Sequence, residues 1–315
     1  MINSANNYHE FAYSVSQVNE WAKKNPEQMI MRMEKAYRED IAKIAQKVME
    51  EGDVKVIMLA GPSSSGKTTT AHFLRDEMKK QGGGATIFSL DDFYLGRGKA
   101  PRLQNGQFDY EALEALDVPQ LRECLTSLIK TRRCRKPVFD FVSGNPFPEK
   151  EEVRLGEHDI AILEGIHALN PAITEHLPKS GLLKLYISVK EGIFKEEGGW
   201  ALSPQSIRFV RRLVRDFYHR GDLPGRTLST WEQVCRGEAL YIHPYKHTSD
   251  ITINSLHVYE PCVMRNCALM LLDQIPQEHP SYDFVERITE SLRRFVPLSE
   301  ELVPPDSMLQ EFLAK

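Results

Sequence analysis

Residues 54–70, VKVIMLAGPSSSGKTTT, place an apolar run directly before a loop of glycines, serines and a lysine. The run 54–60 predicts a buried strand, and residues 67–80 predict a helix. Between them, residues 61–68 fit the phosphate-loop pattern G-x-x-x-x-G-K-[ST], in the strand–loop–helix context that this motif requires. The stretch therefore predicts an α/β fold that binds a nucleotide.

The glycines of this loop allow a backbone path that turns several N–H groups toward one anion, and the following helix adds its partial positive charge. Lys67 is expected to reach the β- and γ-phosphates, and the Thr68 hydroxyl to bind Mg²⁺. We therefore predict ATP and Mg²⁺ as ligands. The predicted nucleotide-binding residues of the loop are Gly61, Pro62, Ser63, Ser64, Ser65, Gly66, Lys67, Thr68 and Thr69.

The composition is that of an ordinary globular protein, with 315 residues, 41% hydrophobic residues and a formal net charge of −4. This charge does not favour a nucleic-acid partner. The apolar runs are shorter than the ~20 residues that span a membrane, and no signal-peptide pattern is visible at the start. We expect a cytoplasmic protein without a membrane or nucleic-acid partner; the oligomeric state stays open, a homo-oligomer included.

Strand and helix patterns alternate from residue 54 onward, which predicts a doubly wound, mainly parallel sheet with helices on both faces. The five expected strands are 54–60, 85–90, 159–165, 182–189 and 250–254. The expected helices are 15–50, 67–80, 111–130, 206–219, 229–240, 259–273 and 282–295. Residues 137–141 and 151–155 predict a small β-hairpin outside the sheet.

Three segments follow from these patterns. Residues 1–50 are expected to form an N-terminal helical extension, residues 51–258 the phosphate-loop domain, and residues 259–315 a C-terminal helical extension packed on the core.

Two acidic residues follow strands whose carboxyl ends meet at the edge of such a sheet where ligands bind. Asp91 is placed to take a proton from a hydroxyl that attacks the γ-phosphate, since phosphoryl transfer needs mainly orientation and late proton acceptance. Glu164 suits Mg²⁺, directly or through water. The alternatives are a turn or helix-capping role for Asp91 and Asp92, and a simple strand-end acid for Glu164.

Residues 206–221, SIRFVRRLVRDFYHRG, carry four arginines on one helical stripe. Like charges four residues apart cost roughly 0.2–0.5 kcal/mol per pair, which favours an anion beside the stripe. We predict a lid helix that closes over ATP, with residues 195–204 as its hinge. A solvated basic face paired with Asp216 and Asp222 is the alternative. The four residues are Arg208, Arg211, Arg212 and Arg215.

Together these motifs resemble the uridine kinase/phosphoribulokinase family of P-loop small-molecule kinases. The matching stretches, in the family's order, are GPSSSGKTT, SLDDFY, NGQFDYEALEALD, KPVFDFVSG, ILEGIH and RFVRRLVRDFYHRG, within residues 54–255. Later features, GEALYIHPYKHTSDITINS, YEP and VPPDSMLQEFL, resemble bacterial uridine kinase-like proteins. The resemblance implies a P-loop kinase without the extra N-terminal domain of long bacterial relatives.

The resemblance implies transfer of phosphate from ATP to the 5′-hydroxyl of a nucleoside, uridine first. It matches Asp91 to the family's catalytic base, Lys67 and Thr68 to its phosphate and Mg²⁺ contacts, Arg208, Arg211 and Arg215 to its lid arginines, and Tyr94, Tyr110 and Phe139 to its nucleoside pocket. With the residue patterns above, we predict the catalytic residues Asp91, Lys67 and Arg211, ATP contacts from Arg208 and Arg212, acceptor contacts that include Asp91 and Arg215, and the metal ligands Thr68 and Glu164. Where uridine-cytidine kinases carry a base-recognising histidine, this chain has Gly144-Asn145-Pro146.

Other functions stay open. The acceptor is a nucleoside, another sugar or a small alcohol such as a ribulose phosphate. An ATP-binding regulator without turnover is a different class, but it has no need for Asp91 beside the phosphates. A partner-coupled ATPase is disfavoured because Glu164 stands alone, where motor and transporter ATPases carry an Asp-Glu pair.

Overall fold

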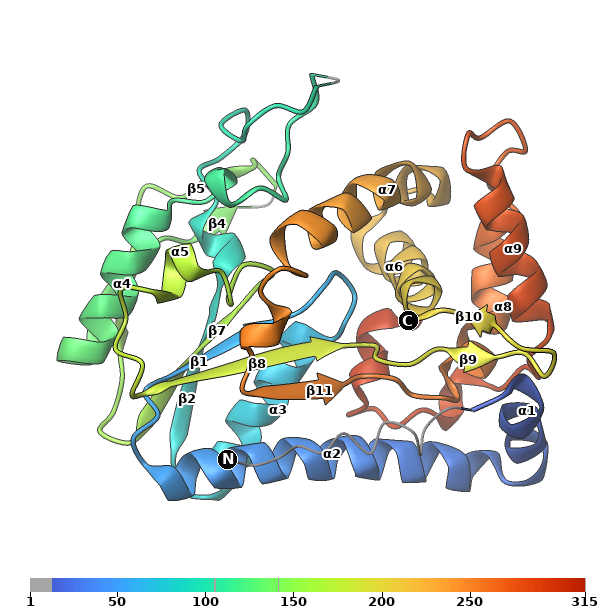
Figure 1. Ribbon diagram of the computed structural model, residues 1–315, viewed down its shortest axis with the longest axis horizontal. Coiled ribbons are helices and arrows are strands. Elements are labelled where there is room, and N and C mark those ends of the chain that lie inside the picture. The colour runs from blue at the N-terminus through green and yellow to red at the C-terminus, as the bar shows by residue number, and fades with distance from the viewer. Residues whose placement is uncertain (1–12, 105, 141, 315) are drawn as a thin grey trace.

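Five parallel strands form the central sheet of the computed structural model (Figure 1). Their order across the sheet is β11–β8–β1–β7–β2, and every neighbouring pair is parallel. The strands are β1 (Val56–Ala60), β2 (Gly84–Ser89), β7 (Asp159–Glu164), β8 (Leu182–Ser188) and β11 (Ile251–Asn254). The predicted fold, a doubly wound α/β sheet of five strands, is confirmed.

The structure describes residues 13–104, 106–140 and 142–314. The predictions that concern residues 1–12, namely the absent signal peptide and the first part of the N-terminal extension, lie outside these residues. In the described part of the chain, no helix is long and apolar enough to cross a bilayer.

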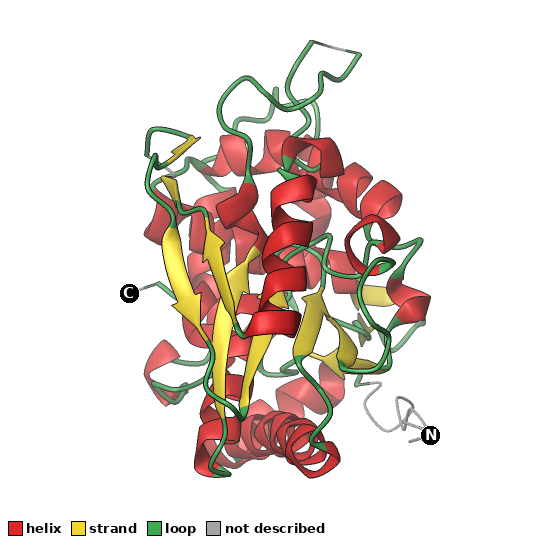
Figure 2. Cartoon of the chain, turned by 90° about the vertical axis from the view of Figure 1, so that its left-hand side faces the viewer, coloured by secondary structure: helices red, strands yellow, loops and turns green. Residues whose placement is uncertain are grey.

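Helices cover both faces of the sheet (Figure 2). Side chains alternate along each strand, so that Leu59 of β1 packs in one hydrophobic cluster and Met58 in another. The first cluster contains residues of α2 (Pro26–Glu51) and α3 (Lys67–Lys80), and the second contains residues of α4 (Val118–Thr131). Both faces are therefore buried, as a parallel sheet requires.

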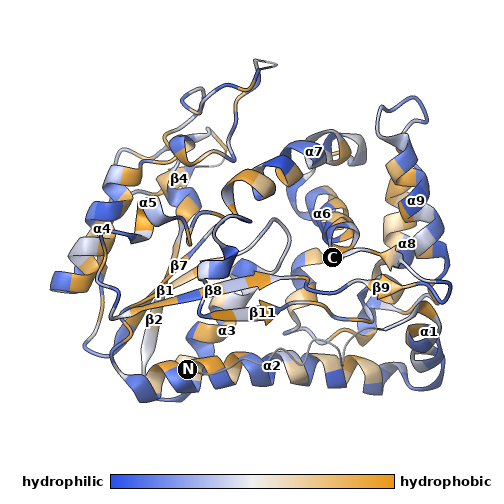
Figure 3. Ribbon diagram, in the orientation of Figure 1, coloured by the Kyte–Doolittle hydropathy of each residue, from blue (hydrophilic) through white to orange (hydrophobic). Residues whose placement is uncertain are grey.

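The two terminal segments pack on the first of these clusters. They comprise α1 (Val15–Lys24) and α2 at one end, and α8 (Glu260–Leu272) and α9 (Tyr282–Arg293) at the other. Helix α2 is amphipathic, with hydrophobic and hydrophilic residues mixed along its length (Figure 3). One cluster thus contains residues from both sides of the boundaries predicted at residues 50 and 258. The packing does not separate the three predicted segments, and their boundaries stay a prediction.

Helix α4 begins at Val118, whereas the sequence predicted a helix from residue 111. Pro119 stands in its first turn and cannot continue a helix from the N-terminal side. Asp117 caps the helix by accepting a hydrogen bond from the backbone N–H of Gln120 at 3.0 Å. Before it, only the short 3₁₀ helix η3 (Leu113–Ala115) forms.

An antiparallel excursion lies outside the sheet, as predicted, but the predicted pairing of its strands was wrong. Strand β6 (Glu151–Arg154) pairs with β3 (Arg133–Lys136), and β4 (Phe139–Asp140) pairs with β5 (Asn145–Pro146). The excursion is therefore two nested antiparallel pairs, and residues 137–141 do not pair with residues 151–155.

A further antiparallel pair, β9 (Ile193–Phe194) with β10 (Trp200–Leu202), fills part of the segment predicted as a hinge. It leads into α6 (Pro204–Arg220), which carries the arginine stripe, and then α7 (Pro224–Tyr241). The 3₁₀ helix η4 (Lys246–Thr248) and α5 (Pro171–Thr174) complete the connections around the sheet.

Candidate active site

The loop after β1 has the features of a phosphate cradle. A Cβ at Gly61 would lie 2.2 Å from the carbonyl oxygen of Ile187, so only glycine fits, and Gly66 precedes α3 as its N-cap with a φ of +86°. The hydroxyls of Ser64 and Ser65 are buried, and neither has a hydrogen-bond partner in the described part of the chain. Unpaired buried donors beside a helix N-terminus fit an anionic ligand, so the loop suits the phosphates of a nucleotide.

Lys67 and Glu164 line the same cleft, and Lys67 Nζ donates to the Pro62 carbonyl at 3.0 Å. Burial raises the pKa of Glu164 to about 6, although Lys67 opposes this rise. Burial also lowers the pKa of Lys67, which Glu164 and Asp91 oppose. Glu164 accepts a hydrogen bond from Ser89 Oγ at 3.0 Å, so its second oxygen is left for another ligand. Thr68 and Glu164 line one cleft, and a hydroxyl with a carboxylate oxygen is a donor set that suits Mg²⁺.

Asp91 follows β2 in the 3₁₀ helix η2 (Leu90–Phe93), and its backbone N–H donates to Ser89 Oγ at 3.3 Å. The side chain of Asp91 is exposed to the cleft, and its desolvation by the surrounding protein raises its pKa, which Lys67 and Arg220 partly oppose. A carboxylate with a raised pKa is a better proton acceptor than an ordinary aspartate.

Asp92 has a different environment from Asp91. Its Oδ2 accepts a hydrogen bond from Lys136 Nζ at 2.8 Å, and its Oδ1 accepts from the backbone N–H of Phe139 at 3.4 Å. Asp92 therefore fixes β4 beside the site, while Asp91 faces the cleft.

One cleft of about 890 Å³ brings most of the predicted residues together. On the acceptor side, the ring of Tyr94 lies 5.7 Å from that of Phe139 and 6.5 Å from that of Tyr110. The predicted residues that line this cleft are Ser63, Ser64, Ser65, Gly66, Lys67, Thr68, Asp91, Tyr94, Tyr110, Phe139, Glu164, Arg212 and Arg215.

The arginine stripe divides into two pairs. Arg212 donates to Ser63 Oγ at 2.8 Å and lines the cleft. Arg215 also lines the cleft, and both arginines contact the buried carboxylate of Asp216. The pairing with Asp216 agrees with the alternative, but Arg215 is only 8% exposed and Asp222 pairs with Arg226, so a solvated face does not form. The lid role stays a prediction.

Arg208 and Arg211 lie behind the phosphate loop. Arg208 pairs with buried Glu238 at 2.5 Å and donates to the Ser63 carbonyl at 3.0 Å. Arg211 has no exposed surface, pairs with Glu260 and donates to the carbonyl of Ser64.

These contacts correct the predicted role of Arg211. The guanidinium of Arg211 is enclosed by protein acceptors and does not line the cleft, so direct contact with the transferred phosphate, as its predicted catalytic role requires, does not fit this geometry. Arg208 also holds the loop through the Ser63 carbonyl, but it lines a second cleft of about 670 Å³ together with Pro62, so its predicted contact with ATP stays a prediction.

The cleft also contains charged residues that the sequence analysis missed. Arg97 and Arg220 line it, and so do Glu111 and Glu311. Burial raises the pKa of Glu111 to about 7, and Arg212 opposes the rise. Glu111 follows FDY in the stretch quoted for the family resemblance, which was a usable signal. Glu311 lies in the stretch VPPDSMLQEFL that was also quoted for the resemblance, but nothing in that stretch assigned it to the cleft.

Comparisons with known proteins show which proteins this chain resembles in sequence. Residues 56–193 match the model of the Phosphoribulokinase / Uridine kinase family. A uridine kinase of Lactobacillus johnsonii is 30% identical over 166 residues, which is 53% of this chain and 69% of that protein. A uridine kinase of Deinococcus deserti is 26% identical over 209 residues, or 66% of this chain and 91% of that protein.

A solved structure from Bacillus stearothermophilus, described as a possible uridine kinase, is similar with a TM-score of 0.48 and 18% identity. The similarity covers 69% of this chain and 98% of that one.

Proposed function

Because the chain belongs to the phosphoribulokinase/uridine kinase family, we propose that it transfers the γ-phosphate of ATP to the primary hydroxyl of a nucleoside, uridine first. The relatives named uridine kinase support a nucleoside acceptor. The observation that carries the proposal is that Lys67 and Asp91 line the same cleft as the rings of Tyr94, Tyr110 and Phe139. A nucleotide sensor needs no carboxylate between the phosphates and an aromatic pocket.

The donor side of the cleft would hold the triphosphate through backbone N–H groups of the loop, Lys67 and the two arginines Arg212 and Arg215. Thr68 and Glu164 are the residues that would hold Mg²⁺, directly or through water. Bound there, Mg²⁺ would neutralise charge on the β- and γ-phosphates. Arg208 and Arg211 would keep the loop in shape from behind, through the carbonyls of Ser63 and Ser64.

On the acceptor side, Asp91 would orient the attacking hydroxyl and accept its proton as the bond to phosphorus forms. Its raised pKa suits this task. The rings of Tyr94 and Phe139 offer faces on which a planar base can stack. Asp92 would support this wall through its contacts with Lys136 and the backbone of Phe139.

A second candidate is a phosphorylated sugar as acceptor, as in phosphoribulokinase. Arg97 favours it, because this arginine lines the cleft near Gly144, where a phosphate on the acceptor could pair with it. The two candidates differ in the charge of the acceptor, so one assay separates them.

The test is an acceptor panel of uridine, cytidine, ribulose 5-phosphate and fructose with Mg·ATP, with ADP release measured for each. We expect uridine to stimulate ADP release most, and the phosphorylated nucleoside to appear by mass spectrometry. Lys67→Ala serves as the inactive control. If ribulose 5-phosphate is the only active acceptor, the second candidate is correct. If no acceptor stimulates ADP release by the wild type, the kinase proposal fails.

A further inference from the structure

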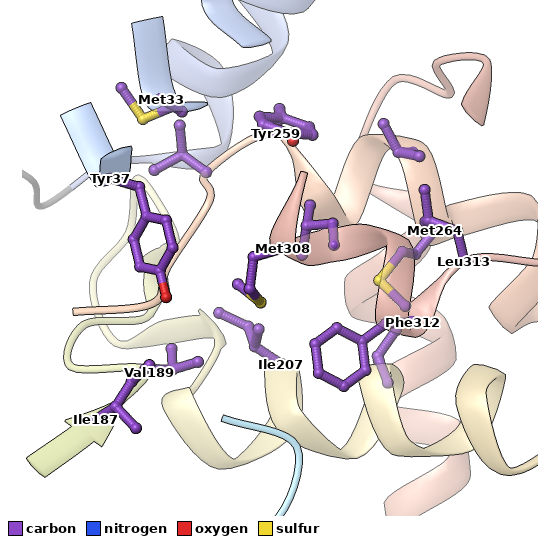
Figure 4. Packing of buried hydrophobic residues seen from close by; sticks show 14 of the residues in the cluster. Met33, Tyr37, Ile187, Val189, Ile207, Tyr259, Met264, Met308, Phe312 and Leu313 are labelled. Carbon is purple, nitrogen blue, oxygen red and sulfur yellow. The ribbon is translucent and has the colours of Figure 1, made fainter. Parts of the chain in front are cut away.

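The C-terminal 3₁₀ helix η6 (Met308–Phe312) lies directly on the phosphate loop. A Cβ at Gly66 would come within 2.6 Å of Met308 Sδ, so the methionine covers the last glycine of the loop. Met308 and Phe312 are fully buried in the main cluster, near Ile207 of α6 (Figure 4). The guanidinium of Arg211 lies 5.3 Å from the ring centre of Phe312. Apolar burial therefore fixes η6 in this place.

A buried polar anchor holds the start of the same segment. Ser307 Oγ donates to Glu34 of α2 at 2.6 Å, and Tyr259 OH donates to the same carboxylate. Ser307 also caps η6 by accepting from the backbone N–H of Leu309 at 3.0 Å. The segment is thus held at both ends by contacts that do not involve the cleft.

This anchoring places the carboxylate of Glu311 among the groups of the donor site. Its Oε2 accepts a hydrogen bond from Thr69 Oγ1 at 2.7 Å, and its Oε1 lies 3.9 Å from Arg215 Nη1. The side chain lines the same cleft as Lys67. Glu311 is one-quarter exposed, whereas its apolar neighbours in η6 are buried, so its side chain has room to turn.

The surroundings of Glu311 are those that favour an anion of the donor. A hydroxyl in the first turn of α3 and an arginine beside it are groups that bind phosphate oxygens. A carboxylate in contact with both satisfies them when no nucleotide is bound. A phosphate at the same place would lie against this carboxylate, and the two negative charges would repel one another.

We propose that Glu311 is an internal competitor of the donor phosphates and sets the affinity for the nucleotide. In the free enzyme its carboxylate occupies Thr69 and Arg215, and on binding the side chain turns away while η6 stays in place. This inference rests on the proposed use of a nucleoside triphosphate. It assigns to the C-terminal segment a role in donor binding that the resemblance in sequence does not include.

The test is the Glu311→Gln variant, whose side chain keeps its shape but loses the charge. Calorimetry would measure the Kd of Mg·ATP and of inorganic tripolyphosphate for the wild type and the variant. We expect both ligands to bind about tenfold more tightly to the variant, because the charge that competes with their phosphates is removed. Tenfold corresponds to about 1.4 kcal/mol.

Glu301→Gln is the matched control, because Glu301 is exposed in η5 (Glu300–Leu302) and its loss changes the net charge equally. The control should bind both ligands as the wild type does. If Glu311→Gln binds Mg·ATP and tripolyphosphate no more tightly than the control and the wild type do, the competitor role is refuted. Binding is measured without an acceptor, so this test does not depend on turnover. A protein that binds both ligands but phosphorylates no acceptor would refute the kinase proposal and leave the competitor role of Glu311 standing.

Discussion

Replacing Arg211 by methionine should lower the stability of the fold, because Arg211 is an interior residue that does not touch the cleft. Its Nε lies 2.5 Å from Glu260 Oε2 and its Nη2 lies 2.8 Å from Oε1. Glu260 is 1% exposed and Arg211 is 0% exposed. The substitution therefore leaves a buried carboxylate without its partner.

Removing one member of a buried ion pair costs about 3–5 kcal/mol, because the remaining charge stays desolvated. The carbonyls of Ser64 and Ser255 lose a donor as well. At about 2–4 °C per kcal/mol for large domains, the melting temperature should fall by roughly 6–20 °C. Thermal unfolding followed by circular dichroism measures this shift.

The double variant Arg211→Met/Glu260→Gln is the internal control. It removes the unpaired charge, and the amide oxygen that replaces the carboxylate can still accept from the backbone N–H of His257, as Glu260 does at 3.0 Å. At least half of the lost stability should return. If Arg211→Met instead keeps its melting temperature and loses activity, the residue contacts phosphate and the argument from burial is refuted.

Three further predictions concern the cleft. Asp92→Asn should weaken the pairing with Lys136 and so loosen the wall that carries Phe139. Steady-state kinetics should then show an acceptor KM about three- to tenfold higher with kcat within about threefold of the wild type, and a fall in kcat as large as the rise in KM would contradict this. Burial raises the pKa of Glu111 from 4.5 to about 7, so the folded protein binds this proton more tightly than the unfolded chain does. The free energy of unfolding therefore falls as the pH rises from about 4.5 to about 7. Glu111→Gln should thus raise the melting temperature at pH 8 and not at pH 5, and an equal shift at both would refute the assignment. Lys67→Ala should reduce transfer at least ~10²-fold with an unchanged melting temperature, and wild-type turnover in this variant would exclude the phosphate-loop assignment.

The sheet and the phosphate loop were predictable because their signals are local. Gly61, Asp91 and Glu164 each stand at the end of an apolar run of strand length. Because parallel strands end at one edge of a sheet, their proximity follows from the runs alone, and the structure brings these ends together. The start of α4 was missed although Pro119 marked it, because the apolar residues before this proline were counted into one helix.

The division of the arginine stripe could not be read from the sequence. Arg211 and Arg212 are neighbours, yet one is enclosed with Glu260 from α8 and the other faces the cleft. Their difference depends on which helix packs against each side of α6, and a periodic pattern does not contain this information. The same holds for Glu311, whose contact with Thr69 depends on the packing of the C-terminal segment.

The measurement that tests the account most directly compares Asp91→Asn with the wild type and with its neighbour variant Asp92→Asn. Acceptor-dependent ADP release gives kcat, and calorimetry gives the Kd of ATP. Asp91→Asn should lower kcat by ~10²–10⁴-fold, the usual range for a positioned general base, while the Kd of ATP changes by less than roughly tenfold. A kcat for Asp91→Asn within about threefold of the wild type would contradict the claim that the acid at the end of β2 accepts the proton of the attacking hydroxyl.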